Sequence, residues 1–345
     1  MLPVLLVFAF LNPQTETFDS AARVREAIER VKPEAFMAST VDWAAIEAEM
    51  LAQSEGAKDT ADMLPAYQTL VERLGDGHSF IQVPAEVKSD WEARHGKARY
   101  RPDIPERPRP VTTFGNRGEV EFKDLPVGSK SARLLNVPLY EGNASSDRAR
   151  AFADTLFNTI ADAPTNTCGY MLDLRGNPGG NLWPMLVGVS GLLGDSEQGL
   201  FKNANGSVDR FARLEGGKAI VNEGEYTGHI MASAPAWRHI DGLDTAPVAV
   251  ITDNSTASSG EGVVIAFIGR PSTRSFGVHT YGVASSNSGF TQNDGVNFVI
   301  TTAMIMDRNE QVYPHGISPD EEVDASGDEP VQAAARWMAT LPACQ

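Results

Sequence analysis

A stretch of small polar residues, 254–259, carries the side chains best suited to nucleophilic chemistry. It follows the apolar run 247–252 and precedes a second apolar run, 263–268. This order predicts a buried strand, a tight turn and a helix. Ser258 and Ser259 would then lie at a helix N-terminus, where unpaired N–H groups and the helix dipole can stabilise an oxyanion. The turn is a good place for a nucleophile, although the same residue types commonly do no more than cap a helix.

A second strand-turn-helix pattern strengthens the catalytic interpretation. Residues 168–174 read as a buried strand, 175–180 as a turn and 181–187 as the opening of a helix. The paired glycines Gly179 and Gly180 would let the backbone approach a ligand and donate N–H groups to it. The turn lacks both the GxGxxG pattern and a Gly-Lys-Ser/Thr ending, so it is a poor dinucleotide or phosphate loop.

Three sequence blocks, in this order and spacing, carry a family resemblance. They are Leu172-Asp173-Leu174-Arg175-Gly176-Asn177-Pro178-Gly179-Gly180-Asn181, Thr256-Ala257-Ser258-Ser259-Gly260-Glu261 and Gly316-Ile317-Ser318-Pro319-Asp320. The blocks resemble the signatures of the serine peptidases that include the C-terminal processing peptidases and the tricorn core. The resemblance covers roughly residues 60–325 and implies a crotonase/ClpP-like β-β-α superhelix, in which two helix N-termini face one cleft.

The resemblance also implies roles for residues of the two turns. In the family the reactive serine stands three residues before the glutamate of its block, and Glu261 fixes that count on Ser258. The backbone N–H groups of Gly179 and Ser259 would hold the oxyanion, and Gly180 would line the cleft. Because a serine hydroxyl is a weak nucleophile at neutral pH, the mechanism also needs a general base.

The base cannot be the lysine of the processing peptidases. That branch places a Lys after Thr-Phe-Gly and a Gln shortly afterwards, whereas this chain has Val283 and Asn287 at those places. The tricorn-like branch uses a His in a loop that follows a helix, upstream of the first block. His78 is the match, so we expect it to be the base, with Asn287 left as a possible cleft residue.

The group that would orient His78 is less well specified. The tricorn-like branch uses a Ser just before the His and a Glu before the third block, but Gly77 and Tyr313 stand there. Asp76 and Glu261 are the remaining candidates. Both could instead have a purely structural role, because acidic residues at helix ends often serve as caps.

The chain divides into four expected segments. Residues 15–80 read as a helical region that delivers the His78 loop, and residues 131–345 as a peptidase core whose repeated β-α-β units favour a parallel sheet in an α/β fold. Residues 81–130 are too few for the PDZ domain that processing peptidases usually insert. This Pro-rich and charged segment is expected to form a small β-rich cap or a flap.

The N-terminus and the two cysteines leave alternatives open. Residues 1–14 begin with an apolar run that could be the core of a secretory signal, or a first strand or helix of the fold. A signal would make the protein secreted or periplasmic, and otherwise it would be cytoplasmic. Cys168 begins a presumed core strand, where a free buried thiol is the commonest explanation; it could pair with Cys344 only if the C-terminus folds back.

Composition narrows the functional classes. The chain has 345 residues and a formal net charge of −16, which argues against nucleic acid and anionic membrane surfaces as partners. No apolar run approaches the ~20 residues of a membrane helix, and no histidine spacing suggests a metal site. We therefore expect a cofactor-free serine peptidase that acts on polypeptides or peptides. The main alternative is a non-catalytic module of the same fold that binds a hydrophobic ligand or peptide. An acyl-CoA enzyme of the crotonase type is disfavoured, because the blocks belong to the peptidase side.

Overall fold

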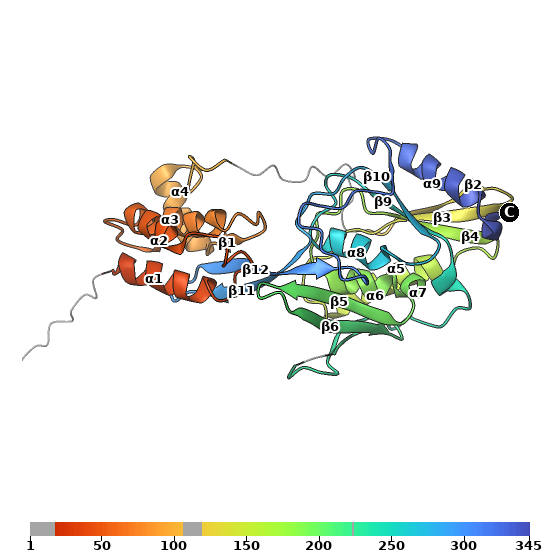
Figure 1. Cartoon of the computed structure of the whole chain (residues 1–345), viewed down its shortest axis with the longest axis horizontal. Helices are drawn as coiled ribbons and strands as arrows, with labels where there is room; N and C mark the ends of the chain where they lie inside the picture. Colours follow the sequence, from red (N-terminus) through yellow and green to blue (C-terminus); the bar gives the residue numbers. More distant parts are fainter. Residues whose placement is uncertain (1–17, 106–118, 223) are drawn as a thin grey trace, which may run out of the picture.

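The computed structural model describes residues 18–105, 119–222 and 224–345 (Figure 1). The possible signal at residues 1–14 and part of the Pro-rich segment lie outside the described residues. The chain forms a mixed α/β structure with two β-sheets and a layer of helices between them. The expected α/β class is therefore confirmed.

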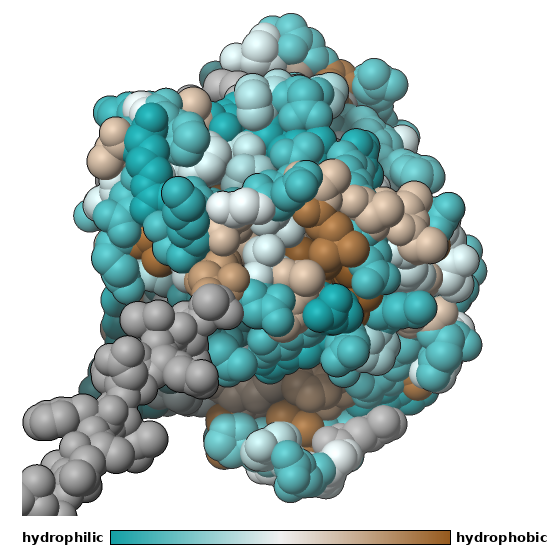
Figure 2. All heavy atoms as spheres, turned by 90° about the vertical axis from the view of Figure 1, so that its left-hand side faces the viewer, coloured by the Kyte–Doolittle hydropathy of each residue, from teal (hydrophilic) through white to brown (hydrophobic). Residues whose placement is uncertain are grey.

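Three N-terminal helices form a unit beside the two sheets: α1 (Ser20–Val31), α2 (Trp43–Gln53) and α3 (Thr60–Arg73). Each begins at an aspartate, Asp19, Asp42 or Asp59, whose side chain accepts a hydrogen bond from a first-turn N–H group. Their apolar faces pack on the strand that carries Phe298 and Ile300, so this unit shares its core with a sheet. The end of the molecule formed by this unit is largely hydrophilic, with small hydrophobic patches (Figure 2). These three helices lie within the segment 15–80 that was expected to be helical.

One sheet has six strands in the order β13-β10-β9-β4-β3-β2, and all neighbours are parallel except β2 and β3. The strands are β2 (Phe122–Val127), β3 (Lys130–Asn136), β4 (Thr167–Asp173), β9 (Val248–Thr252), β10 (Thr273–Gly277) and β13 (Glu321–Glu322). The middle strands are nearly continuous apolar runs, as expected for a parallel sheet covered on both faces. The expected parallel sheet is thus present.

The other sheet is antiparallel, with the order β1-β12-β5-β6-β7-β8 and β11 paired with β12. Its strands are β1 (Phe80–Gln82), β5 (Ser196–Asn203), β6 (Val208–Glu215), β7 (Lys218–Val221), β8 (Ile230–Ser233), β11 (Ser285–Thr291) and β12 (Asn297–Met306). The β11–β12 hairpin reaches from the core into the N-terminal unit (Figure 1). This hairpin contacts both the His78 loop and the rest of the protein.

Helices fill the space between the sheets and cover the outer face of the parallel one. The helices are α5 (Asp147–Ala161), α6 (Leu182–Gly188), α7 (Ser190–Leu193), α8 (Ser259–Phe267) and α9 (Glu329–Ala339), with short 3₁₀ turns at Leu243–Thr245 and Pro342–Cys344. Alternate residues of β9 face opposite sides: Val248 and Val250 contact the inner helices, whereas Ala249 and Ile251 contact the α9 side. Burial on both faces fixes the strand register on which the site depends.

The expectation of a β-rich cap at residues 81–130 is wrong for residues 85–95, which form helix α4 (Ala85–His95). Pro84 precedes the helix, and α4 buries Trp91 against the N-terminal unit. Strand β2 lies in the same expected segment but pairs with β3 of the parallel sheet, so it belongs to the core. Trp91 is the one buried residue of α4 and Val87 its one other large apolar side chain, so the helix leaves little periodic signal, which explains why the sequence did not predict it.

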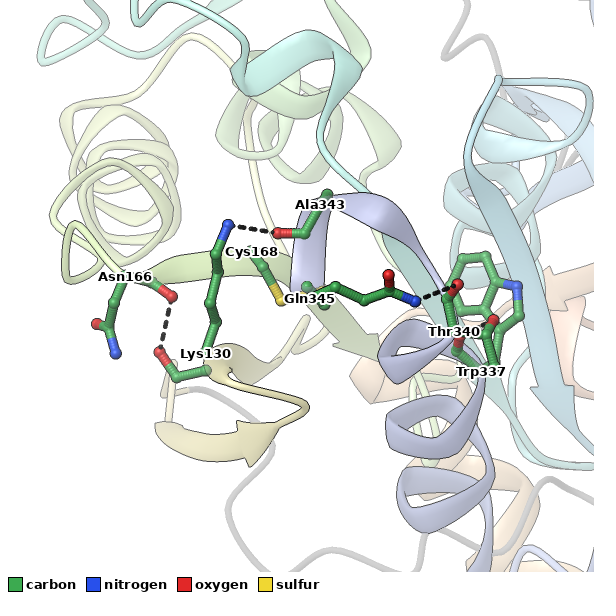
Figure 3. The surroundings of a disulfide bond; sticks show 9 residues. Lys130, Asn166, Cys168, Trp337, Thr340, Ala343 and Gln345 are labelled. Carbon is green, nitrogen blue, oxygen red and sulfur yellow. Dashed lines mark hydrogen bonds between the residues drawn. A yellow bond between two sulfur atoms is a disulfide. The ribbon is translucent and has the colours of Figure 1, made fainter.

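The sequence left open whether Cys168 is a free thiol or pairs with Cys344, and in the structure the two form a disulfide (Figure 3). The C-terminus folds back along α9 and reaches the start of β4. There the Lys130 ammonium donates a hydrogen bond to the carbonyl of Ala343 at 2.8 Å. Gly128 allows the approach, since a Cβ atom at this position would lie 2.3 Å from the carbonyl oxygen of Cys344.

Candidate active site

The two predicted turns lie side by side because they follow neighbouring parallel strands, β4 and β9, whose carboxyl ends meet at one edge of the sheet. Buried Asp253 joins them: its carboxylate accepts hydrogen bonds from the N–H of Gly176 at 3.1 and 3.2 Å and from the N–H of Ser255 at 2.9 Å. The N–H of Ala257 donates to the carbonyl of Asn177 at 2.9 Å. Tertiary hydrogen bonds therefore hold the two turns as one rigid piece.

Ser258 stands at the N-terminus of α8 in an unusual backbone conformation. Its φ of 51° and ψ of −120° are costly for a residue with a side chain, and such strain persists only where surrounding contacts impose it. The N–H of Ser258 donates to Oε2 of Glu261 at 3.0 Å. The side chain is neither fully buried nor fully exposed, so it combines a fixed backbone with access to solvent.

Glu261 is completely buried and anchors a neighbouring segment. Its Oε1 accepts hydrogen bonds from the Thr280 hydroxyl at 2.6 Å and the Gly282 N–H at 2.9 Å, and its Oε2 accepts from the Val283 N–H at 2.9 Å. Burial raises the pKa of the Glu261 carboxyl, and these donors together with the N–H of Ser258 oppose that rise. These contacts show Glu261 holding the 280–283 segment against the Ser258 turn.

The glycine pair lies directly against the serine. A Cβ atom on Gly179 would lie 2.7 Å from the Cβ of Ser258 and 3.1 Å from its Oγ, so only glycine permits this approach. The N–H of Gly179 donates to Oδ1 of Asn177 at 2.9 Å and is therefore already used. The Ser259 hydroxyl donates to the carbonyl of Gly180 at 2.6 Å. Within the described residues, the N–H groups of Gly180 and Ser259 have no hydrogen-bond acceptor.

His78 comes from the N-terminal unit, in the loop between α3 and β1. Asp76 shapes this loop: its Oδ1 accepts from the N–H groups of His78 at 2.8 Å and Ser79 at 2.7 Å, and its Oδ2 accepts from the Ser79 hydroxyl at 2.6 Å. These are the contacts of an Asx turn, which positions backbone. The imidazole Nδ1 of His78 lies 2.7 Å from the hydroxyl oxygen of Ser285.

Ser285 is a residue that sequence reasoning missed. It is 8% exposed and begins β11, two residues after Val283, the place where the lysine-dependent branch carries its base. Val283 itself is buried in this protein. Asn287, a predicted cleft residue, donates from its side-chain amide to the carbonyl of His78 at 3.3 Å. Residues 280–287 thus contact the serine turn through Glu261 at one end and the histidine loop at the other.

A cavity of about 740 Å³ lies beside His78. It is lined by the loop that carries His78, by parts of α3, α4 and β1, and by Tyr281. The N–H of Tyr281 donates to the carbonyl of Thr256 at 2.9 Å, so the cavity wall is continuous with the serine turn. The part of the chain that the structure describes holds no cluster of His, Cys, Asp or Glu side chains suited to a metal ion. Nor does this part contain a helix of the length and apolarity that a membrane crossing requires.

The sequence profile of peptidase family S41 matches residues 137–323, which is more than half of the chain. The chain therefore belongs to peptidase family S41, and it is a serine-type peptidase. Among curated proteins it is 26% identical, over 298 residues, to the nisin-resistance protein of Lactococcus lactis subsp. lactis, covering 86% of this chain and 81% of that protein.

Two solved structures share the fold over nearly the whole chain. A lipoprotein from Streptococcus agalactiae superposes with a TM-score of 0.65 at 22% identity, covering 96% of this chain and 99% of that one. The photosystem II D1 C-terminal processing protease superposes with a TM-score of 0.56 at 13% identity, covering 94% and 97% of the two chains. The family named in the sequence analysis is thereby confirmed.

Proposed function

We propose that the protein hydrolyses peptide bonds by acyl transfer, with Ser258 as nucleophile and His78 as general base. Ser258 Oγ would form a bond to the carbonyl carbon while its proton passes to His78, which then gives it to the leaving amine. Water would release the acyl group by the same route. The observation that carries this proposal is the strained Ser258 at the start of α8, packed on Gly179 and tied through Glu261 to the segment that contacts His78.

For the oxyanion we propose the backbone N–H groups of Ser259 and Gly180. Ser259 is the first residue of α8, where the dipole adds to the hydrogen bond. The N–H of Gly179, the donor expected from the sequence, is engaged by Asn177. Gly179 then serves the site by allowing close approach, and Gly180 supplies the donor.

For the orientation of His78 we propose Ser285 rather than Asp76 or Glu261. When the Ser285 hydroxyl accepts a hydrogen bond from Nδ1–H, the lone pair of Nε2 is left to accept the proton of Ser258. The Asp76 carboxylate is occupied with the backbone and Ser79, and Glu261 with the 280–283 segment. A neutral hydroxyl can accept from Nδ1–H and hold the imidazole ring in place, but it adds little charge stabilisation to the imidazolium.

We further propose that the core is a crotonase/ClpP-like β-β-α superhelix and that the protein works outside the cytoplasm. The paired strand-turn-helix units that join at one sheet edge support the first point. The Cys168–Cys344 disulfide supports the second, because structural disulfides persist mainly in oxidising compartments.

A fluorophosphonate probe tests the central proposal. It should label the wild-type protein at Ser258, and peptide mapping should locate the adduct there. The Ser258→Ala protein, folded by circular dichroism, should not react. A non-catalytic binding module, the main alternative, predicts no labelling of either protein, and an adduct on Ser259 would show that the serine register is wrong.

A second and narrower candidate is a role in resistance to a peptide antibiotic. The 26% identity to the nisin-resistance protein over 86% of this chain favours it. Expression in a nisin-sensitive host should raise the nisin concentration that stops growth. The Ser258→Ala protein, expressed at the same level, should lose that effect if peptide hydrolysis causes it.

A further inference from the structure

Strand β1, which follows the His78 loop, is an edge strand with an identifiable free side. The described part of the chain pairs it only with β12. The N–H of Thr301 donates to the hydroxyl of Ser79, so Thr301 directs its backbone groups toward the β1 side of β12. Backbone direction alternates along a strand, and Val299 must therefore point the same way. Val299 is paired with Phe80, which makes these two residues the hydrogen-bonded pair.

Ile81, the next residue, must then direct its N–H and carbonyl away from β12. Neither group has a hydrogen-bond partner within the residues that the structure describes. Ile81 also lines the 740 Å³ cavity, together with His78. One donor and one acceptor of a strand edge are therefore available beside the proposed general base.

The part of the cavity wall formed by α4 and the loop after it is held by several contacts. The indole N–H of Trp91 in α4 donates to the carbonyl of Ala98 at 2.9 Å, and Tyr100 packs edge-on against the same indole at 5.3 Å. The buried guanidinium of Arg101 donates to Glu49 at 2.9 Å and to Asp103 at 2.6 and 2.8 Å. The loop that follows α4 is thus anchored on both sides of Arg99.

Two cations of this wall are unpaired. Lys97 and Arg99 line the cavity, are exposed, and form no ion pair with any described residue. Of the other cations in the lining, Arg101 is paired with Glu49 and Asp103, and Lys88 lies 4.0 Å from Glu92. The lining also includes Glu72 of α3, which accepts a hydrogen bond from Gln68 and forms no ion pair with a described residue. Two unpaired cations against one such carboxylate still favour an anionic ligand group in a chain of net charge −16.

We propose that the cavity binds an extended segment of the peptide substrate, which adds as a strand to β1 at Ile81 and places a carboxylate beside Lys97 and Arg99. The inference rests on the proposed peptidase function and names the substrate feature that this site selects. Strand addition gives affinity without sequence demands, and the cations give the preference. The carboxylate is either an acidic side chain or the chain terminus of the peptide.

The backbone part is tested by a matched pair of variants, Ile81→Pro and Ile81→Ala. Proline removes the outward N–H and is tolerated on an edge strand, whereas alanine keeps it. Binding of fluorescein-labelled extended peptides is measured on the Ser258→Ala background. Ile81→Pro should weaken binding about tenfold relative to Ile81→Ala, the loss of one hydrogen bond. Equal affinities for the two variants would overturn the strand-addition proposal.

The charge part is tested with four versions of one peptide: Glu or Gln at an internal position, each with a free or amidated C-terminus. The wild-type protein should bind at least one carboxylate-bearing version about fivefold more tightly than the amidated Gln version, which has neither carboxylate. The double variant Lys97→Ala/Arg99→Ala should bind these versions equally. Lys123→Ala, an exposed lysine of β2 outside the cavity, should keep the preference. The four versions show which carboxylate is bound, and equal binding of all four by the wild-type site would refute the charge preference.

Hydrolysis of a small p-nitrophenyl ester separates this inference from the proposed function, because such an ester needs the serine and histidine but not β1. If the cavity variants still hydrolyse the ester and their peptide affinity is also unchanged, the proposed cavity site is wrong and the peptidase proposal stands. Absent turnover and absent fluorophosphonate labelling in the wild type overturn the peptidase, while the binding measurements still decide the cavity. If Ile81→Pro alone loses ester turnover, the variant has disturbed the active site, and peptides N-methylated at each backbone position in turn are used in its place. Equal binding of the methylated and unmethylated peptides would then refute strand addition.

Discussion

The two halves of the proposed site are held in different ways. Around Ser258, Asp253 and Glu261 are buried carboxylates that accept hydrogen bonds from several backbone N–H groups in the interior. Around His78, the partly exposed Asp76 carboxylate shapes a loop at the end of a helical unit. The serine half is therefore preorganised by the parallel sheet, while the histidine half is positioned by the hairpin that begins at Ser285.

This difference predicts which substitutions the fold can tolerate. A buried carboxylate with several donors leaves all of them unsatisfied when it is removed, which is costly. The His78 loop is held by hydrogen bonds at the surface of a helical unit, including those from Asn287 and Thr301, so the loss of one of them can shift the loop without unfolding the protein. We expect removal of the Asp253 or Glu261 carboxylate to affect folding and catalysis together, and changes near His78 to affect catalysis alone.

The largest expected effect is on the two reacting residues. Ser258→Ala and His78→Ala should each lower kcat by a factor on the order of 10³ or more, and the double variant should be no worse, since such groups act as a unit. Ser259→Ala is the matched variant, because only its backbone is proposed to act, and it should lose less than about tenfold. Turnover of a chromogenic peptide is the measurement. Wild-type activity in His78→Ala would remove the histidine from the mechanism.

The next largest effect is expected from removing the disulfide, which should change stability but not catalysis. Cys168→Ala/Cys344→Ala should lower the free energy of unfolding by about 3 kcal/mol, because the cross-link constrains the unfolded chain. The bridge lies at the start of β4, whereas the site lies at its carboxyl end, so kcat/KM at 25 °C should stay within about twofold. Urea unfolding and peptide turnover on the same samples check both halves. A large loss of activity in the folded variant would contradict the separation.

A smaller effect is expected from Ser285, and it tests the histidine half directly. Ser285→Ala should lower kcat about tenfold with little change in KM or melting temperature, because one hydrogen bond to the imidazole is lost. The pH profile of kcat/KM should also move, which a merely structural residue would not cause. Ser286→Ala provides the neighbouring control. An unchanged profile in Ser285→Ala would assign the orientation of His78 to another group.

The smallest effect concerns acid stability of the N-terminal unit. Hydrogen bonds from Arg73 and Arg101 lower the pKa of Glu49 from 4.5 to about 2. A depressed carboxyl pKa stabilises the fold above pH 4.5, and this contribution is lost as the pH falls toward 2. Solvent screening limits it to about 1 kcal/mol. In Glu49→Gln the melting temperature should change less between pH 4.5 and pH 2 than it does in the wild-type protein. Glu55→Gln, an exposed glutamate, should not.

Much of the site could be predicted from local sequence, because its chemistry depends on short motifs. The turns at 175–180 and 254–259 are flanked by apolar runs long enough to define strands and helices, and the structure confirms both strand-turn-helix units. Helix α3 ends before Gly75, whose φ of 71° is the left-handed conformation expected at this position. The family followed from the same motifs.

Other features depended on residues far apart in the sequence, which local patterns do not encode. Ser285 contacts His78 across 207 residues, and the Cys168–Cys344 pair spans 176 residues. Apart from Val87 and Trp91, helix α4 has only alanines and polar residues, so its periodic signal is weak and it depends on packing against the N-terminal unit.

The sequence by itself therefore determined the family, the nucleophile turn and the expectation that a histidine replaces the missing lysine. Only the tertiary structure decided which groups surround that histidine and which N–H groups remain for an oxyanion. The physical reason is that the motif turns are built by contacts between near neighbours in the sequence, such as that of Asn177 with Gly179. Ser285 meets His78 across 207 residues, and the free edge at Ile81 depends on how β1 pairs with β12, so only the folded sheets determine them.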